Sequence, residues 1–283
     1  MVGMVWATKA AVRPLFSSTP RLSLRSQSIA LGLATLLLLL AWGVWHSELN
    51  RAWLLAVHAS DMGPDALWIF LTQWGDAAVV LLLLLVLGRS SRLGAALAIK
   101  GFLLGSLVSP LLKAWWSVPR PLAVIEAGLL SPMGNPPGAA NSMPSGHALA
   151  ASTLVCLIIL MYPSLLRRKA VVLPLILGGL VVAFSRVVVG AHWPADVLAG
   201  LGLGVWMAWL AMRWEVWWPW SPFFATLWGN GLLLLLELGL TVYVVLTAPP
   251  QTAGLAAMLV VALLGLLSVL LRYIGLRQPS AGR

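Results

Sequence analysis

Pro144-Ser145-Gly146-His147 joins a loop rich in Gly and Pro to a long apolar run. A Ser-Gly pair that leads into a helix points backbone N–H groups, and the positive end of the helix dipole, toward an anion. The histidine beside them can exchange protons near neutral pH. The stretch therefore predicts a small phosphate cradle with an acid or base at its edge. Because Pro-Ser-Gly also forms ordinary turns, this interpretation depends on the rest of the chain.

The composition indicates a membrane protein with several spans. Hydrophobic residues make up 60% of the 283 residues, charged residues only 9%, and the mean hydropathy is +0.95. A water-soluble domain cannot cover its surface with so few charges. The formal charge of +10 does not indicate nucleic-acid binding, because Lys and Arg lie mainly between apolar runs, where they set membrane orientation. The single cysteine, Cys156, excludes an intrachain disulfide.

The apolar runs predict an all-α, polytopic membrane bundle of eight spans. The spans cover about residues 28–45, 66–87, 93–112, 146–162, 170–186, 195–212, 226–247 and 253–271. With the N-terminus inside, the basic turns all fall on the cytoplasmic side, as the positive-inside rule requires. Both termini are then cytoplasmic, and loops 46–65, 113–145 and 187–194 lie outside. We interpret residues 1–27 as a cytoplasmic basic tail and not as a transit-peptide-like leader, since the first span is long enough to remain in the membrane.

Basic, histidine and carboxylate residues gather near the span ends that this arrangement places outside. Lys113 and Arg120 are separated by six residues and break the positive-inside pattern, which favours a functional role. Arg186 is followed after five residues by His192, and after three more by Asp196. These residues and the phosphate-cradle stretch are therefore expected to meet at one membrane level.

Three cations, a backbone cradle and two histidines describe a phosphoryl-transfer site that needs no metal. Arg makes planar, bidentate contacts with phosphate oxygens, and Lys adds a point charge. His192 and Asp196, four residues apart at a helix start, lie on one face, so the carboxylate can hold the imidazole in one tautomer. One histidine can attack phosphorus while the other protonates the leaving oxygen, and the pattern alone does not say which.

Three motifs, complete and in order, carry a resemblance to a known family. They are Lys113-(six residues)-Arg120-Pro121, Pro144-Ser145-Gly146-His147, and Ser185-Arg186-(five residues)-His192-(three residues)-Asp196. This set resembles the signature of the type 2 phosphatidic acid phosphatase (PAP2) superfamily, in its membrane lipid phosphatase branch. The resemblance covers about residues 28–212 and implies a six-span catalytic core. Residues 213–283 would then form an aromatic interface segment and two additional transmembrane helices.

The resemblance also implies a role for each motif residue. His192 would be the nucleophile that forms a phosphohistidine, Asp196 would orient it, and His147 would be the general acid for the leaving group. The phosphate-binding residues would be Lys113, Arg120, Ser145, Gly146 and Arg186. No metal and no cofactor is implied.

The implied function is a metal-independent lipid phosphate or diphosphate phosphatase at the extracytoplasmic face of the plasma (bacterial inner) membrane. The favoured substrate is undecaprenyl diphosphate or a similar polyprenyl diphosphate. A phosphatidate or phosphatidylglycerol phosphate phosphatase, a lipid A phosphatase or phosphotransferase, and a lipid-binding or transport protein on the same scaffold are the alternatives. The expected partners are the lipid phosphate substrate and membrane lipids, with no nucleic acid, and the sequence does not indicate an oligomeric state.

Charged residues within the predicted spans are costly unless they are paired or functional. Asp76 falls near the middle of the second span, and Lys100 and Glu237 lie at similar depth in the third and seventh. Their opposite signs make Lys100 and Glu237 candidates for a pair that fastens the last two spans to the core. The alternatives are that Lys100 reaches the nearer surface and that Glu237 is protonated. The tryptophans that flank the site are interpreted as interface anchors or as part of a lipid-tail entrance, namely Trp115, Trp116 and Trp193.

Overall fold

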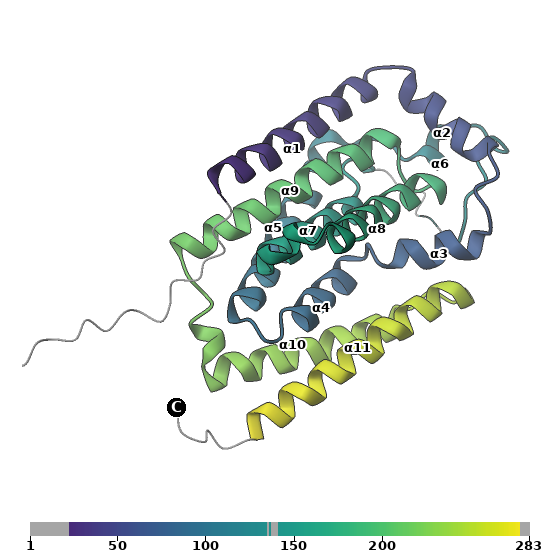
Figure 1. Ribbon diagram of the computed structural model, residues 1–283. Helices are drawn as coiled ribbons and strands as arrows, with labels where there is room; N and C mark the ends of the chain where they lie inside the picture. The colour runs from purple at the N-terminus through teal and green to yellow at the C-terminus, as the bar shows by residue number, and fades with distance from the viewer. Residues whose placement is uncertain (1–22, 135, 137–140, 278–283) are drawn as a thin grey trace, which may run out of the picture.

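The computed structural model describes residues 23–134, 136 and 141–277, and every regular element in these ranges is helical. The helices are α1 (Leu24–Trp45), α2 (Leu49–Ala59), α3 (Asp65–Gln73), α4 (Ala77–Leu87), α5 (Arg92–Trp116), α6 (Pro121–Val124), α7 (Gly146–Met161), η1 (Pro163–Arg167), α8 (Lys169–Val188), α9 (Pro194–Trp217), η2 (Phe223–Ala225), α10 (Leu227–Leu246) and α11 (Thr252–Arg277). Figure 1 shows the long helices side by side, with their connections at two ends. The all-α bundle is confirmed. Most of the predicted tail, residues 1–22, lies outside the described ranges.

Six helices of the described chain are long and apolar enough to cross a membrane, namely α1, α5, α8, α9, α10 and α11. The pair α3 and α4 passes the same criteria together, but it bends by 61° between its halves. The helix α7 has 16 residues, fewer than the roughly 20 that cross a bilayer, and most of its side chains are buried between its neighbours. Because six of its helices can cross a bilayer, the protein is an integral-membrane bundle.

The predicted second span is wrong as one continuous helix. It breaks after α3, and Asp76 begins α4 as its N-cap instead of lying inside a helix. The carboxylate oxygen Oδ1 accepts hydrogen bonds from the amides of Ala78 at 2.9 Å and Val79 at 3.2 Å. The charge within the span is explained because a side-chain oxygen satisfies N–H groups that the first turn of a helix leaves unpaired.

The helix α9 packs closely on α1 and α7 because it carries glycines on two faces. A Cβ added at Gly200 or Gly204 would lie 2.5 Å from a backbone oxygen of Ser145 or Leu149, respectively. A Cβ added at Gly202 would lie 2.8 Å from a backbone oxygen of α1. Small residues permit such close helix packing in membranes. The phosphate-cradle stretch at the start of α7 is thereby held against the helix that carries Asp196.

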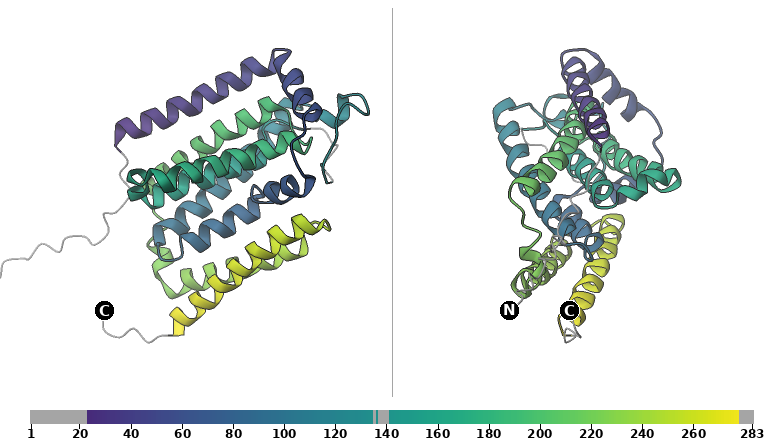
Figure 2. Two further views of the ribbon diagram at one scale, coloured as in Figure 1. Left: turned by 45° about the vertical axis from the view of Figure 1, so that its right-hand side comes forward. Right: turned by 60° about the vertical axis from the view of Figure 1, so that its left-hand side comes forward.

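The helices α10 and α11 pack on α3 and α4, on the far side of the bundle from α1. The two views of Figure 2 agree that α1 and the α10–α11 pair lie at opposite margins. The pair is therefore an addition to the outer face of the bent span.

Lys100 is fully buried in α5, but its predicted pairing with Glu237 is wrong. Its Nζ donates to Glu215 Oε2 at 2.5 Å and to the Trp218 carbonyl at 2.6 Å. The ammonium also lies 5.2 Å and 4.8 Å from the ring centroids of two further tryptophans, Trp214 and Trp220. The partner comes from the end of α9 because α9 packs directly on α5.

Glu237 faces α11 and finds its partners there. Its Oε1 accepts from Arg272 Nη2 at 2.5 Å, and its Oε2 accepts from Ser268 Oγ at 3.0 Å. This ion pair fastens α10 to α11. The other buried pair, Lys100 with Glu215, joins α5 to α9 within the core.

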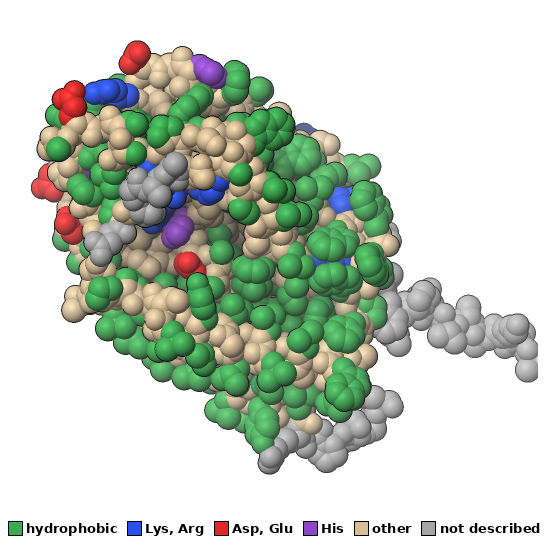
Figure 3. Space-filling model, turned by 180° about the vertical axis from the view of Figure 1, so that it is seen from behind, with side chains coloured by type: hydrophobic (Ala, Val, Ile, Leu, Met, Phe, Trp, Pro, Cys, Tyr) green, Lys and Arg blue, Asp and Glu red, His purple; other side chains and the backbone are tan. Residues whose placement is uncertain are grey.

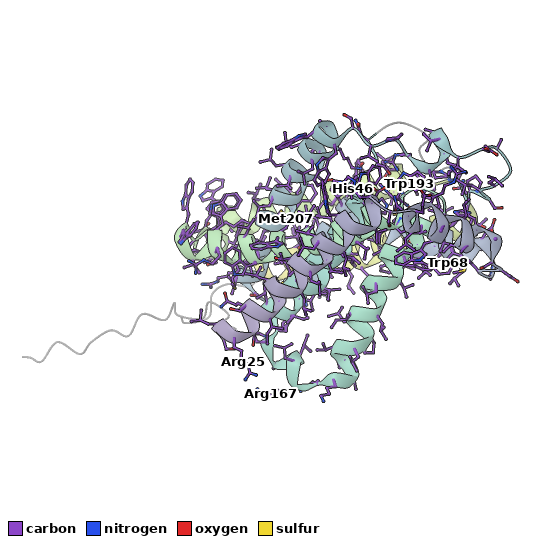
Figure 4. All side chains as sticks on the ribbon, turned by 90° about the horizontal axis from the view of Figure 1, so that it is seen from above. Arg25, His46, Trp68, Arg167, Trp193 and Met207 are labelled. Atoms are coloured by element: carbon purple, nitrogen blue, oxygen red, sulfur yellow. The ribbon has the colours of Figure 1, made fainter. Side chains whose placement is uncertain are left out.

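The bundle has two chemically different ends. Figure 4 shows Arg25 and Arg167 toward one end, and Trp68 and Trp193 toward the other. We call the second the motif end, since α5 and α8 finish there and α7 and α9 begin there. The first described residue of α1 and the last turn of α11 both lie at the opposite end (Figure 1).

Candidate active site

All the predicted site residues lie at the motif end of the bundle. Lys113 is in the last turn of α5, Arg120 is the N-cap of α6, and Arg186 is in the last turn of α8. Proline at the first position of α6 and of α9 suits a helix start, because the missing N–H would have been unpaired there. The space-filling view of Figure 3 shows Lys and Arg side chains, a histidine and a carboxylate gathered in a hollow among hydrophobic surface.

His192 and Asp196 form a buried pair at the start of α9. The distance from His192 Nδ1 to Asp196 Oδ2 is 3.1 Å, and His192 is only 3% exposed. The same carboxylate oxygen accepts the Trp193 amide at 2.9 Å and a short hydrogen bond from the Ser142 hydroxyl. The carboxylate is thus held from three directions, which fixes the orientation of the imidazole.

The other ring nitrogen, His192 Nε2, faces a cation. Arg120 Nη1 donates to it at 3.4 Å and to the Ala191 carbonyl at 2.8 Å. Because the carboxylate accepts from Nδ1–H, the lone pair resides on Nε2. Burial, and then the charges of Arg186, Arg120 and Lys113, holds the pKa of His192 well below its ordinary 6.5. The imidazole is therefore neutral and can act as a nucleophile near neutral pH.

Lys113 and Arg186 are each held by neighbouring oxygen atoms. Lys113 Nζ donates to the carbonyls of Asn141 at 2.9 Å and Ser142 at 3.0 Å. Arg186 Nη1 donates to Thr72 Oγ1 at 2.5 Å. The Nε–H groups of Arg186 and Arg120 are buried and have no partner within the described ranges. Both guanidinium groups therefore keep donors for an anion, and phosphate suits their planar geometry.

The two residues of the predicted cradle differ in what they can offer. Ser145 is fully buried, its amide donates to the Asp196 carbonyl at 2.9 Å, and its hydroxyl accepts the Ala148 amide at 3.4 Å. Its backbone is thus committed to joining α7 to α9. Gly146, the first residue of α7, is partly exposed and lines the cavity described next. Of the two amides, that of Gly146 is the one that can approach a phosphate.

His147 lines a cavity of about 370 Å³ between α4, α5 and α7. Gly75 lies against it, since an added Cβ there would be 2.9 Å from His147 Cβ. His147 also lies within electrostatic reach of His192 and of the three site cations. Asp76, the neighbour of Gly75 in the chain, also lines the cavity. The rest of the lining is mostly apolar and includes Leu81, Phe102 and Leu149. The cavity therefore places the His147 imidazole at the edge of an apolar chamber.

Three residues of the site escaped the sequence analysis. Ser142 lies three positions before Ser145, and its hydroxyl near the motif was an available signal. Thr72 stands in the bent span four residues before Asp76, where two polar residues one turn apart could have drawn attention. Asn50, in α2, accepts the Ala195 amide at 3.0 Å and so supports the start of α9.

Trp193 does not serve as an exposed interface anchor. It is buried, and its Nε1–H donates to the Pro119 carbonyl at 2.8 Å, which ties α9 to the loop that carries Arg120. Within the described ranges, no three His, Cys, Asp or Glu side chains gather closely enough to hold a metal ion.

Comparison with known proteins places this arrangement in a family. Residues 89–220 match the family model described as the PAP2 superfamily. An undecaprenyl-diphosphatase of Sulfolobus acidocaldarius is 32% identical over 154 residues, covering 53% of this chain and 70% of that protein. Undecaprenyl-diphosphatase BcrC of Bacillus subtilis is 28% identical over 152 residues, covering 53% of this chain and 74% of that protein.

A solved structure shares the fold. The crystal structure of a transmembrane PAP2-type phosphatidylglycerolphosphate phosphatase from Bacillus subtilis superposes with a TM-score of 0.52 at 21% identity. The match covers 67% of this chain and 96% of that one, and at this identity it bears on the fold alone. By family match, identity to curated relatives and fold, the chain belongs to the PAP2 superfamily as an integral-membrane member.

Proposed function

We propose that this PAP2 phosphatase removes the terminal phosphate of a membrane lipid diphosphate, with undecaprenyl diphosphate or a similar polyprenyl diphosphate as substrate. The observation that carries the proposal is the His192 ring, held at Nδ1 by Asp196 while Nε2 faces Arg120. Simple anion binding does not need an oriented nucleophile. The substrate class is supported by two relatives named as undecaprenyl-diphosphatases.

In this mechanism His192 Nε2 attacks the terminal phosphorus as the bond from phosphorus to the bridging oxygen breaks. His147 gives its proton to that oxygen, and the lipid monophosphate leaves. Water, deprotonated by His147, then attacks the phosphohistidine, which releases inorganic phosphate and restores His192. Asp196 stabilises the charge that the imidazole acquires.

The remaining motif residues would stabilise the phosphoryl group in transfer. Lys113, Arg120 and Arg186 offset the charge on its oxygens, and the Gly146 amide and the Ser145 hydroxyl complete the cradle. The apolar chamber beside His147 supports a substrate whose tail remains in the membrane.

The proposed location of the site is the extracytoplasmic face, with both termini in the cytoplasm. The basic turns 89–92 and 167–169 lie at the end opposite the motif end, which suits the positive-inside rule. Residues 28–212 would be the catalytic core, and residues 213–283 would add the aromatic segment with α10 and α11.

Phosphate release by the purified protein in detergent tests the proposal. Undecaprenyl diphosphate should be hydrolysed faster than phosphatidylglycerol phosphate or phosphatidate, and excess chelator should leave the rate largely intact. His192→Ala should abolish phosphate release. It should also abolish the acid-labile, base-stable phosphate label that a rapid quench with labelled substrate traps on the protein. His147→Ala should slow both, and His46→Ala, at an exposed histidine near the same end, should change neither. Tight binding of every lipid without phosphate release would instead indicate a lipid-binding protein.

A further inference from the structure

A second cavity, of about 430 Å³ and with a polar lining, lies at the end of the bundle opposite the candidate active site. Its polar lining comes from the α4–α5 turn, the start of α10 and the end of α11, and consists of Arg89, Ser90, Ser91, Arg92, Asn230 and Arg272. The 25 residues of α5 separate it from the motif end, on the order of 37 Å at 1.5 Å per residue. The cavity therefore belongs to a different site.

Arg272 supplies a fixed cation to this cavity. It is 8% exposed, and its Nη2 donates to Glu237 Oε1 at 2.5 Å. Its Nε–H is buried and has no partner within the described ranges. Glu237 also accepts from Ser268, so it holds the guanidinium in place without using all of its donors. A buried arginine with unpaired N–H groups at a cavity wall is suited to an anion.

The rest of the lining adds positive potential. Arg89 and Arg92 are exposed on the α4–α5 turn, and none of the described residues that line the cavity carries a carboxylate. With Glu237 behind Arg272, three arginines and one carboxylate leave a local charge of 3 − 1 = +2. The N-terminus of α5, capped by Ser91, also faces this space.

The positive-inside rule explains exposed arginines in a turn, but it does not account for Arg272. That residue comes from a different helix, is buried, and meets the turn across a polar cavity. Basic pockets between transmembrane helices are suited to the phosphate of a lipid headgroup. We propose that this cavity binds a phosphate-bearing anion, supplied by an anionic lipid headgroup or by free inorganic phosphate, and that the bound phosphate joins α11 to the α4–α5 turn.

Thermal-shift titrations of the full-length protein in a non-ionic detergent test the proposal. The probes are dioleoyl phosphatidylglycerol, inorganic phosphate, and dioleoyl phosphatidylcholine as a lipid without net charge. The test variant is Arg89→Gln/Arg92→Gln. The matched control is Arg167→Gln/Arg168→Gln, which removes two exposed charges from another turn at the same end. Far-UV circular dichroism and elution volume check that both variants are folded.

We expect phosphatidylglycerol to raise the unfolding temperature of the wild type. Arg89→Gln/Arg92→Gln should raise the lipid concentration at half-saturation roughly tenfold or more, and the control should raise it less than about twofold. Protection by phosphatidylglycerol alone identifies a lipid headgroup. Protection by inorganic phosphate that is reduced in the test variant identifies free phosphate, since phosphate bound at the active site would be retained in it. Equal shifts in the two variants would show diffuse surface charge, and no protection by either phosphate probe would also overturn the proposal. Arg272→Gln/Glu237→Gln, which removes the buried cation with its counter-charge, should weaken binding in the same way.

Discussion

One oxygen of Asp196 receives hydrogen bonds from His192 Nδ1, the Trp193 amide and the Ser142 hydroxyl. Two of these donors come from the same helix start, and the third comes from the loop before α7. The carboxylate therefore positions the imidazole and also joins two parts of the site. We infer that Ser142 is a positioning residue, because its hydroxyl contacts Asp196 and would act on the reaction only through that carboxylate.

Asp196→Asn should lower kcat by roughly 10⁴-fold while the protein remains folded. The amide can donate a hydrogen to Nδ1, which places the ring proton on Nε2 and removes the attacking lone pair; the magnitude is that of the same change in a serine protease triad. Initial rates of phosphate release would measure it. A loss of less than about tenfold would show that Asp196 does not set the tautomer.

Ser142→Ala should lower kcat by about tenfold and leave KM unchanged, since one hydrogen bond to a buried carboxylate is lost. Ser152→Ala is the matched control, because the Ser152 hydroxyl donates to the Leu201 carbonyl between α7 and α9, away from the pair. A change in KM without a change in kcat would place Ser142 in substrate binding instead.

At the scale of elements, the bend between α3 and α4 brings backbone against the start of α7. Gly75 occupies this position, and a Cβ there would lie 2.9 Å from both His147 Cβ and Val182 Cγ1. The bend thus sets the place of His147, the proposed general acid, and a side chain at the bend would displace it.

Gly75→Ala should lower kcat/KM by roughly 10- to 100-fold, since small displacements of a catalytic group are costly. Overpacking should also destabilise the fold by about 1–3 kcal/mol. Gly178→Ala, in α8 with no atom within 4 Å of an added Cβ, is the control and should leave both quantities nearly unchanged. Full activity of Gly75→Ala would mean that α7 is placed independently of the bend.

The buried pair of Lys100 and Glu215 links α5 to the end of α9. Lys100→Met or Glu215→Gln alone should each destabilise the protein by about 3–5 kcal/mol, because one buried charge loses its partner. The losses should not add in the double variant. Lys100→Met combined with Glu237→Gln should be additive within about 0.5 kcal/mol, since those residues do not meet. Thermal or denaturant unfolding in detergent measures both cycles, and coupling only in the second would contradict the structure.

At the scale of the whole molecule, the described chain begins and ends at one side of the bundle, because α1 begins at the end where α11 finishes. The candidate active site and the polar cavity lined by Arg89, Arg92 and Arg272 lie at opposite ends. A single-residue probe at each end can therefore test the proposed orientation.

Cysteines introduced at Ser90 and Glu126, in a Cys156→Ser background, should be labelled from opposite membrane faces by an impermeant thiol reagent. Both positions are exposed, Ser90 in the α4–α5 turn and Glu126 after α6. In intact cells we expect Glu126→Cys to react and Ser90→Cys to react only after permeabilisation. The reverse pattern would place the active site in the cytoplasm.

The membrane class, the positions of most helices and the residues of the motifs could all be predicted from the amino-acid sequence. These properties depend on local patterns, since an apolar run specifies a helix in lipid and four-residue spacing places His192 and Asp196 on one helix face. The same reasoning identified Lys100 and Glu237 as charges in need of partners.

The partners of Lys100 and Glu237 depend on how the helices pack and could not be predicted from the sequence. Helical periodicity says which side chains share a face, but not which neighbouring helix that face meets, so Lys100 pairs with Glu215 and Glu237 with Arg272. The bend at Gly75, the contact of Ser142 with Asp196 and the gathering of Arg89, Arg92 and Arg272 around one cavity have the same cause. Each joins residues far apart in the chain through packing between helices, which no local pattern encodes.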